Sequence, residues 1–101
     1  MVRHLSPERV AAMARSAQTL VIDVRESSEY AGGHIPRAKH ISLSQLVHRL
    51  KEVPKDKTVV VVCRSGSRSQ RAAELLLEAG FRNVYNMSGG MQRWSGPTVA
   101  H

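Results

Sequence analysis

Short runs of apolar residues alternate along the chain with segments in which apolar residues recur at helical spacing. The clearest run, TVVVV over residues 58–62, is β-branched at every position. Such a run is typical of a strand that is buried on both faces of a parallel sheet. The run TLVIDV over residues 19–24 predicts a second central strand, and residues 2–5, 39–42 and 84–86 predict shorter ones. We therefore expect a central sheet of about four to five strands.

Helical segments separate these strands. Ser6-Pro7-Glu8 predicts a helix start, because serine caps a helix, proline suits its first position and an acid stabilises its first turn. Further helices are predicted over residues 27–31, 42–50, 68–79 and 90–94. Ser42 and Gln45 match a capping box, and Gly80 matches a helix end. This alternation predicts an α/β fold with a small central parallel sheet and helices on both of its faces.

Apolar residues at helical spacing mark the faces that two of these helices are expected to bury. The face of the first helix contains Val10, Met13, Ala14 and Ala17. The face of the helix after Ser42 contains Leu43, Leu46, Val47 and Leu50. We expect both faces to pack against the sheet.

The composition fits one globular domain over residues 1–101. Of these residues, 42% are apolar and 23% are charged, as in folded rather than disordered chains. The N-terminus lacks the apolar core of a signal peptide, and no run approaches the roughly 20 apolar residues of a membrane helix. The single cysteine rules out an internal disulfide, and a lone thiol suits a reducing compartment. We therefore expect a soluble, cytoplasmic protein.

The net charge of +7 is compatible with a small anionic substrate, an acidic partner or nucleic acid. The Lys and Arg residues are scattered, with no run longer than two, and only 4% of the residues are aromatic. A base-stacking platform needs more aromatic residues, so we do not expect nucleic-acid binding. The lack of a long apolar run leads us to expect no membrane binding either. The histidines lack metal-ligand spacing, and no cysteine pair accompanies them, so no metal site is expected.

The only cysteine, Cys63, stands between the strongest predicted strand and a predicted helix. In open parallel sheets, ligands bind at the carboxyl ends of the strands. The loop RSGSR over residues 64–68 is small enough for its backbone N–H groups to form an anion nest, and Arg64 and Arg68 add positive charge. These features favour the thiolate, so the loop predicts an activated nucleophile. An inert buried cysteine that closes a strand is the alternative.

The length of this loop bears on the reaction class. Tyrosine and dual-specificity phosphatases carry five residues between the cysteine and the arginine, whereas four residues separate Cys63 from Arg68. A shorter loop suits a sulfur atom better than a tetrahedral phosphate. The only aspartates, Asp23 and Asp56, offer no clear general acid. A phosphatase or arsenate reductase is therefore the least favoured alternative.

Four motifs follow one another along the chain: VIDVRE at residues 21–26 with Glu29-Tyr30, GHIP at 33–36, VCRSGSRS at 62–69, and SGGM at 88–91 with Trp94. Together they resemble the signatures of the rhodanese family, in particular of its single-domain sulfurtransferases. The resemblance implies a rhodanese-like α/β fold over nearly the whole chain. The chain departs from the family pattern at Arg37, where a small residue, often glycine, is usual, and at Ser65, where some thiosulfate-using relatives have lysine.

The resemblance also implies a persulfide mechanism. The Cys63 thiolate would take the outer sulfur of a donor such as thiosulfate and pass it to cyanide, a small thiol or a protein cysteine. No metal or organic cofactor is implied. The expected site comprises Cys63 as nucleophile, Arg64, Ser65, Gly66, Ser67 and Arg68 as the anion-binding loop, and Asp23, Arg25 and Ser69 as supporting residues.

Several site residues have a structural interpretation beside the functional one. For Asp23 and Arg25 we favour a buried ion pair that ties loops together. Ser67 is a candidate N-cap of the following helix, and His34 is expected to bond backbone in its loop. At the level of function, the alternative to an enzyme is a persulfide carrier or sensor that docks on a partner through its basic surface. Turnover with small donors and free acceptors distinguishes the two.

Overall fold

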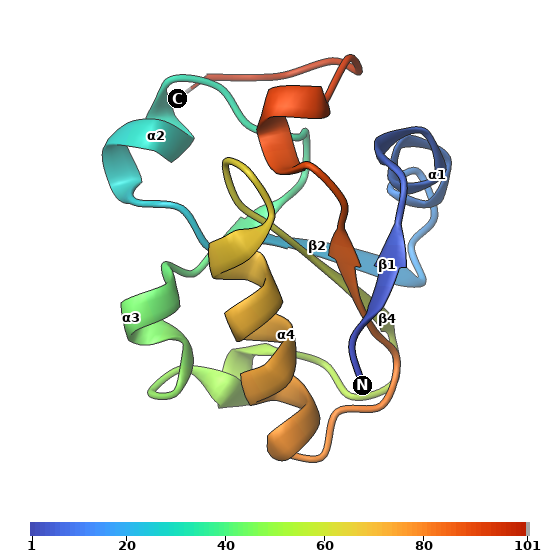
Figure 1. Cartoon of the computed structure of the whole chain (residues 1–101), viewed down its shortest axis with the longest axis vertical. Helices are drawn as coiled ribbons and strands as arrows, with labels where there is room; N and C mark the ends of the chain where they lie inside the picture. The colour runs from blue at the N-terminus through green and yellow to red at the C-terminus, as the bar shows by residue number, and fades with distance from the viewer. Residues whose placement is uncertain (101) are drawn as a thin grey trace.

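A five-stranded, fully parallel sheet forms the centre of the molecule (Figure 1). The structure is a computed structural model, and it describes residues 1–100, so the last residue of the expected domain lies outside the described part. The strands are β1 (Arg3–Leu5), β2 (Thr19–Asp23), β3 (Lys39–His40), β4 (Thr58–Val62) and β5 (Val84–Met87). Their order across the sheet is β1-β5-β4-β2-β3. The predicted α/β fold is confirmed, with five strands where four to five were expected.

The strand β4 occupies the middle of the sheet because its residues suit burial on both faces. It pairs with β2 on one side and with β5 on the other. Val59 and Val61 belong to the apolar core on one face, and Val60 and Val62 to the core on the opposite face. Both cores are apolar, so this strand has no solvent-facing side.

Helices cover both faces of the sheet, as predicted. They are α1 (Pro7–Met13), α2 (Ser27–Ala31), α3 (Leu43–Leu46) and α4 (Ser67–Glu78), with the 3-10 helices η1 (Leu50–Glu52) and η2 (Gly90–Arg93). Side chains of α3 and α4 enter one core, and side chains of α1 and η2 pack on the other. None of the helices in residues 1–100 is long and apolar enough to cross a membrane.

The first helix starts as predicted and ends earlier than its apolar spacing suggests. Ser6 is the N-cap, and its side chain accepts a hydrogen bond from the Arg9 amide at 3.1 Å. The helix ends at Met13, and Ala17 is exposed. The expected buried face is therefore limited to its first part, where Val10 is fully buried.

The region after Ser42 differs most from the prediction. The predicted strand over residues 39–42 spans only Lys39–His40, and the predicted helix over 42–50 is a single turn, α3, followed by η1. The side chain of Ser42 makes no capping hydrogen bond, so the predicted capping box is wrong. Val47 is 49% exposed, because the helix ends before its apolar face can continue along the sheet. One turn is enough to bury Leu46.

Candidate active site

The expected active-site loop lies at the carboxyl end of the central strand β4. Cys63 follows the last residue of β4, and α4 begins four residues later at Ser67. The start of η2 fixes this loop from the far side: the Met91 amide donates to the Cys63 carbonyl at 2.8 Å, and the Gln92 amide donates to the Arg64 carbonyl at 3.0 Å. Two consecutive carbonyls of the loop are thereby tied to a segment that is distant in sequence.

Two glycines give this loop its shape. Gly66 is the N-cap of α4 with a φ of 107°, a conformation that glycine adopts without strain, and it takes the place predicted for Ser67 as cap. Gly90 has a φ of 62°, and a Cβ there would lie 2.5 Å from the carbonyl oxygens of Cys63 and Arg64. The glycine at 90 lets η2 approach the loop closely enough to bond it.

The sulfur of Cys63 lies inside the loop and accepts hydrogen bonds from it. The Gly66 amide donates to Sγ at 3.0 Å, and the Ser69 hydroxyl donates to Sγ at 3.3 Å. Burial acts to raise the pKa of the Cys63 thiol, but hydrogen bonds from the Ser69 hydroxyl and from the amides of Ser69, Gly66 and Ser65 outweigh it. The pKa therefore lies below its ordinary value, and the thiolate is favoured.

A buried side chain behind the sulfur fixes these donors. The Ser69 hydroxyl also contacts Oδ1 of Asn86, and Nδ2 of Asn86 donates to the Gly66 carbonyl at 3.1 Å. Asn86 belongs to β5 and is buried next to β4. A hydroxyl has one proton, so Ser69 can give it either to Asn86 or to the sulfur. Both acceptors lie within reach of this one hydroxyl.

The sequence suggested that both arginines of the loop favour the thiolate, but the structure places them differently. Both terminal nitrogens of Arg68 donate to the carboxylate of Glu29 in α2, at 2.8 and 2.9 Å. The hydrogen bond from Arg68 is the first cause that lowers the pKa of Glu29 to about 2. Arg64 is exposed. The main causes of the low thiol pKa are therefore hydrogen bonds from uncharged groups, rather than the arginine charges named in the prediction.

Asp23 and Arg25 form the buried ion pair that we favoured from the sequence. The Asp23 side chain is fully buried and that of Arg25 is 9% exposed, with Nη2 and Oδ2 2.8 Å apart. The same Nη2 donates to the Gly33 carbonyl at 2.8 Å, and the Arg25 amide donates to Oδ1 of Asp23 at 3.0 Å. The pair ties the end of β2 to the loop that contains residues 33–36.

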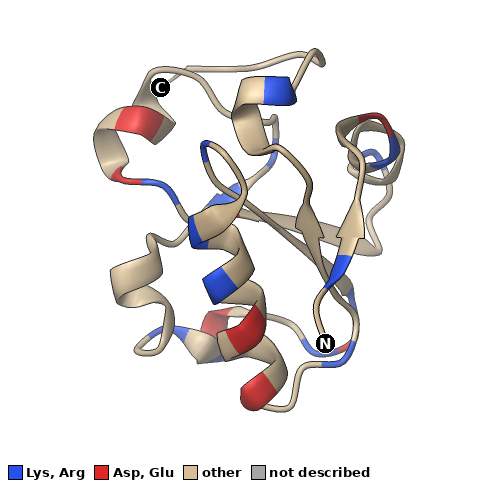
Figure 2. Cartoon of the chain, in the orientation of Figure 1, with Lys and Arg blue, Asp and Glu red and all other residues tan. Residues whose placement is uncertain are grey.

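A shallow pocket opens beside Arg64 of the Cys63 loop. It has a volume of about 350 Å³ and is lined by Arg25, Glu29, Arg64, Met91 and Gln92. Cys63 itself is fully buried. Figure 2 shows blue, positively charged segments on the loop between β4 and α4, with a red segment of α2 nearby. The loop around a thiol that favours its thiolate form thus contributes Arg64 to a pocket in which two of the five lining residues described are arginines.

Comparison with known proteins agrees with this geometry. Residues 6–97 match the model of the Rhodanese-like domain. The chain belongs to the rhodanese-like family. It is 43% identical to the protein YqhL of Bacillus subtilis over 99% of this chain and 78% of that one. It is also 34% identical to the thiosulfate sulfurtransferase GlpE of Shewanella oneidensis, over 91% of each chain.

The structural comparison leads to the same family. A rhodanese-related protein from Thermoplasma volcanium superposes with a TM-score of 0.90 at 30% identity, covering 98% of this chain and 99% of that one. The rhodanese-like fold that the sequence motifs implied is therefore confirmed. Several relatives are named sulfurtransferases, so the chain belongs to a rhodanese-like family that contains sulfurtransferases.

Two residues that contact the Cys63 loop were absent from the predicted set. Glu29 was quoted only as part of a motif, and its partner Arg68 lies 39 positions away, so nothing local linked them. Asn86 was assigned only to a strand. A polar residue within the short run VYNM is a detectable signal, because a buried polar side chain needs hydrogen-bond partners. Ser65 and Ser67, which the prediction included, are exposed, with hydroxyls 3.5 Å apart.

His34 takes the structural position that the sequence suggested. Its Nδ1 lies 2.9 Å from the Tyr30 carbonyl, and its ring stacks on the Tyr30 ring with centroids 3.7 Å apart. Within residues 1–100, no group of three or more His, Cys, Asp or Glu side chains is arranged to hold a metal ion.

Proposed function

We propose that this rhodanese transfers sulfane sulfur and carries it on Cys63 as a persulfide. The observation that supports the proposal most directly is the set of hydrogen bonds that Sγ receives from the Gly66 amide and the Ser69 hydroxyl. These bonds favour the thiolate, which is the nucleophilic form of cysteine. Since Cys63 is the only cysteine, the sulfur has one possible carrier thiol in the chain.

The proposed reaction has two displacements at sulfur. The Cys63 thiolate attacks the outer sulfur of thiosulfate, the sulfur–sulfur bond of the donor breaks, and sulfite leaves with the bonding electron pair. An acceptor such as cyanide then attacks the terminal sulfur of the persulfide. The second sulfur–sulfur bond breaks, thiocyanate forms, and the Cys63 thiolate is restored. Each step is balanced, and the cycle needs no external oxidant or reductant.

The charges of the pocket beside Arg64 suit an anionic donor. Arg68 is compensated by Glu29 and Arg25 by Asp23, which leaves Arg64 as the exposed cation of the loop. We assign the first contact with the donor to Arg64. Because Cys63 has no exposed surface, residues 64–68 must shift before the donor sulfur reaches Sγ.

This reactive thiol fits a reducing compartment, and we place the protein in the cytoplasm.

A sulfur carrier that serves one partner protein is the second candidate. The same burial of Cys63 favours it, because a docking protein is well suited to open the loop. In that case the acceptor is a cysteine of the partner, and free cyanide or small thiols discharge the persulfide slowly.

Intact mass spectrometry tests the proposal. The protein is measured as isolated, after excess thiosulfate, and after subsequent cyanide. We expect a gain of about one sulfur atom that cyanide removes. Rapid removal by cyanide supports an enzyme with small substrates, and slow removal supports the carrier. No gain in mass with thiosulfate or with a polysulfide donor, from a thiol that still alkylates at neutral pH, would overturn the sulfur-transfer proposal.

A further inference from the structure

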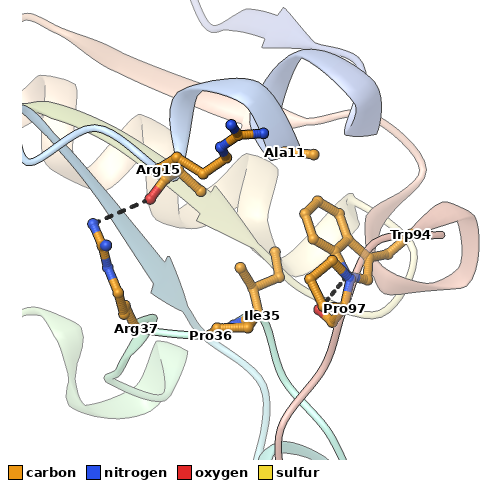
Figure 3. A pocket seen from close by; sticks show the side chains of 8 residues that line it. Ala11, Arg15, Ile35, Pro36, Arg37, Trp94 and Pro97 are labelled. Atoms are coloured by element: carbon orange, nitrogen blue, oxygen red, sulfur yellow. Dashed lines mark hydrogen bonds between the residues drawn. The ribbon is translucent and has the colours of Figure 1, made fainter.

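A second pocket lies on the α1 side of the sheet, away from the Cys63 loop. It has a volume of about 320 Å³, within the range of small-molecule sites. It is lined by Ala11, Ala14, Arg15, Ile35, Pro36, Arg37, Trp94 and Pro97. Neither Cys63 nor any residue of the loop 64–68 is among them. Figure 3 shows Arg37 at one end of the pocket, Trp94 and Pro97 at the other, and Ile35 and Pro36 between them.

The walls of this pocket are apolar and held in place. The indole Nε1 of Trp94 donates to the Pro97 carbonyl at 3.0 Å, which leaves the ring to offer its apolar surface. A Cβ at Gly96 would come within 2.7 Å of the Trp94 ring, so the ring packs closely on the chain that follows it. His34 and Val99 exchange two backbone hydrogen bonds of 2.9 Å, and these fix the far end of that segment.

The charges around the pocket have one sign. Among the residues that the structure describes, Arg15 and Arg37 are the only ionisable ones in the lining, and both are exposed. A neighbouring hollow of about 270 Å³ shares Ala14, Pro36 and Arg37 and adds Lys57. Neither lining includes a carboxylate among the residues that the structure describes. No ion pair of Arg15 or Arg37 occurs within residues 1–100, so both guanidinium groups are available to an anion.

The backbone of Arg37 provides independent support. Its φ of 70° is the only positive φ among the non-glycine residues described. Glycine adopts this conformation without strain, whereas a side chain is disfavoured there. The guanidinium reaches back to α1, where Nη2 lies 3.4 Å from the Ala14 carbonyl. An arginine in a strained position at the edge of a pocket suggests that its side chain has a role.

We propose that this pocket binds a small aromatic carboxylate. The ring would lie on Pro36 and Trp94, both partly exposed in the lining, above the buried Ile35. The carboxylate would meet Arg15 and Arg37, since guanidinium groups pair with carboxylates by charge-assisted hydrogen bonds. A peptide is less suited to the pocket. Its backbone needs hydrogen-bond partners, and Trp94 Nε1 and the Ala14 carbonyl are already engaged.

Trp94 is the only tryptophan of the chain and lines the pocket, so its fluorescence reports binding there. The probe is phenylacetate, and the matched neutral compound is phenylacetamide. We expect a saturable change in fluorescence with phenylacetate and about tenfold weaker binding of the amide. Backbone amide NMR shifts should concentrate at residues 35–37 and 94–97.

Three variants complete the test. Arg37→Gly removes the guanidinium and the strained side chain, so it should fold at least as well as the parent and bind phenylacetate about tenfold more weakly. Arg15→Gln should weaken binding in the same direction. Arg82→Gln removes one exposed positive charge outside the pocket lining and should leave binding unchanged.

The proposal is overturned by any of four results. These are the absence of saturable binding, equal affinity for the amide, unchanged affinity in both Arg37→Gly and Arg15→Gln, and NMR shifts centred on residues 64–68. Binding of an acidic peptide without binding of phenylacetate would assign the groove to a protein partner instead. Cys63→Ser should bind phenylacetate normally, so this test is independent of the sulfur-transfer proposal.

Discussion

The carboxyl ends of β2 and β4 lie side by side and are built on different principles. Asp23, the last residue of β2, pairs in register with Val62, the last residue of β4. At the end of β2, two full charges neutralise each other in the buried Asp23–Arg25 pair. At the end of β4, a single sulfur is surrounded by uncharged donors, the Gly66 amide and the Ser69 hydroxyl.

This difference is the reason that we assign the proposed sulfur chemistry to the end of β4. A buried carboxylate held by an arginine at 2.8 Å is fully committed to its partner, and it serves to hold loops in place. Amide and hydroxyl donors stabilise a thiolate without neutralising it, so the sulfur keeps its nucleophilic charge. We therefore expect changes at the end of β2 to lower stability and changes at the end of β4 to lower reactivity.

Replacing the sulfur should abolish function and spare the fold. Cys63→Ser should lower the rate of sulfur transfer by more than about a thousandfold, because a serine hydroxyl is not ionised at neutral pH and cannot hold a persulfide. The measurement is thiocyanate formation from thiosulfate and cyanide. The melting temperature of the Cys63→Ser variant should stay within a few degrees of the parent value. Residual turnover at the parent rate would show that Cys63 is not the nucleophile.

Breaking the buried pair at β2 should cost stability. Arg25→Met leaves the Asp23 carboxylate buried without its cation, and we expect the free energy of unfolding to fall by about 3–5 kcal/mol. Urea denaturation measures this change in the free energy of unfolding. The matched control is Arg49→Met, which removes the exposed Arg49–Glu52 pair and should change the free energy of unfolding far less, because solvent screens an exposed pair. Equal losses in the two variants would contradict the structural role of the buried pair.

Pushing η2 away from the loop should damage both stability and reactivity. Gly90→Ala places a Cβ 2.5 Å from two loop carbonyls at a φ of 62°, so we expect a loss of about 2–3 kcal/mol. Gly32→Ala is the control, because its φ is −75° and the nearest atom to its Cβ is 3.5 Å away. Thermal unfolding of both variants, compared with their rates of thiol alkylation, tests the prediction. An unaffected Gly90→Ala protein would show that η2 does not support the loop.

Removing one donor to the sulfur should weaken the thiolate. Ser69→Ala deletes the hydroxyl that helps to lower the pKa of Cys63, so the pKa should rise and alkylation at neutral pH should slow by about three- to tenfold. The pH profile of alkylation by iodoacetamide gives both quantities. Ser65→Ala is the control, since its hydroxyl makes no bond to Sγ. A profile that does not move in Ser69→Ala would mean that the backbone amides alone set the thiol pKa.

The smallest effect on stability is expected at the partly exposed ion pair between Arg68 of α4 and Glu29 of α2. The side chains of Arg68 and Glu29 are 33% and 29% exposed, so Glu29→Gln should cost no more than about 1 kcal/mol at neutral pH. The pKa of Glu29 falls from 4.5 to about 2 on folding, so its stabilisation is present above pH 4.5 and is lost as the pH falls toward 2. Parent and variant should therefore converge in stability at acid pH. A constant difference between them across this range would contradict the prediction.

Local patterns predicted most of the fold and the place of Cys63 at the end of the central strand, and they failed where contacts between distant residues decide the structure. The run at residues 58–62 identified the central strand because burial on both faces demands such a run. Ser42 met the pattern of a capping box, but its helix is a single turn and the box does not form. Arg68 was read as a partner of the thiolate because Glu29, its actual partner, is 39 positions away.

The sequence by itself determined the α/β class, the central strand, and the position of one thiol at a strand end followed by a small flexible loop. These features are local, because β-branched runs, caps and glycines act through neighbouring backbone. Only the tertiary structure decided which groups surround the sulfur. Asn86 on β5 and Ser69 on α4 meet behind Cys63 because the sheet order places β5 beside β4. A hydrogen bond depends on separation in space, and the folded sheet sets that separation.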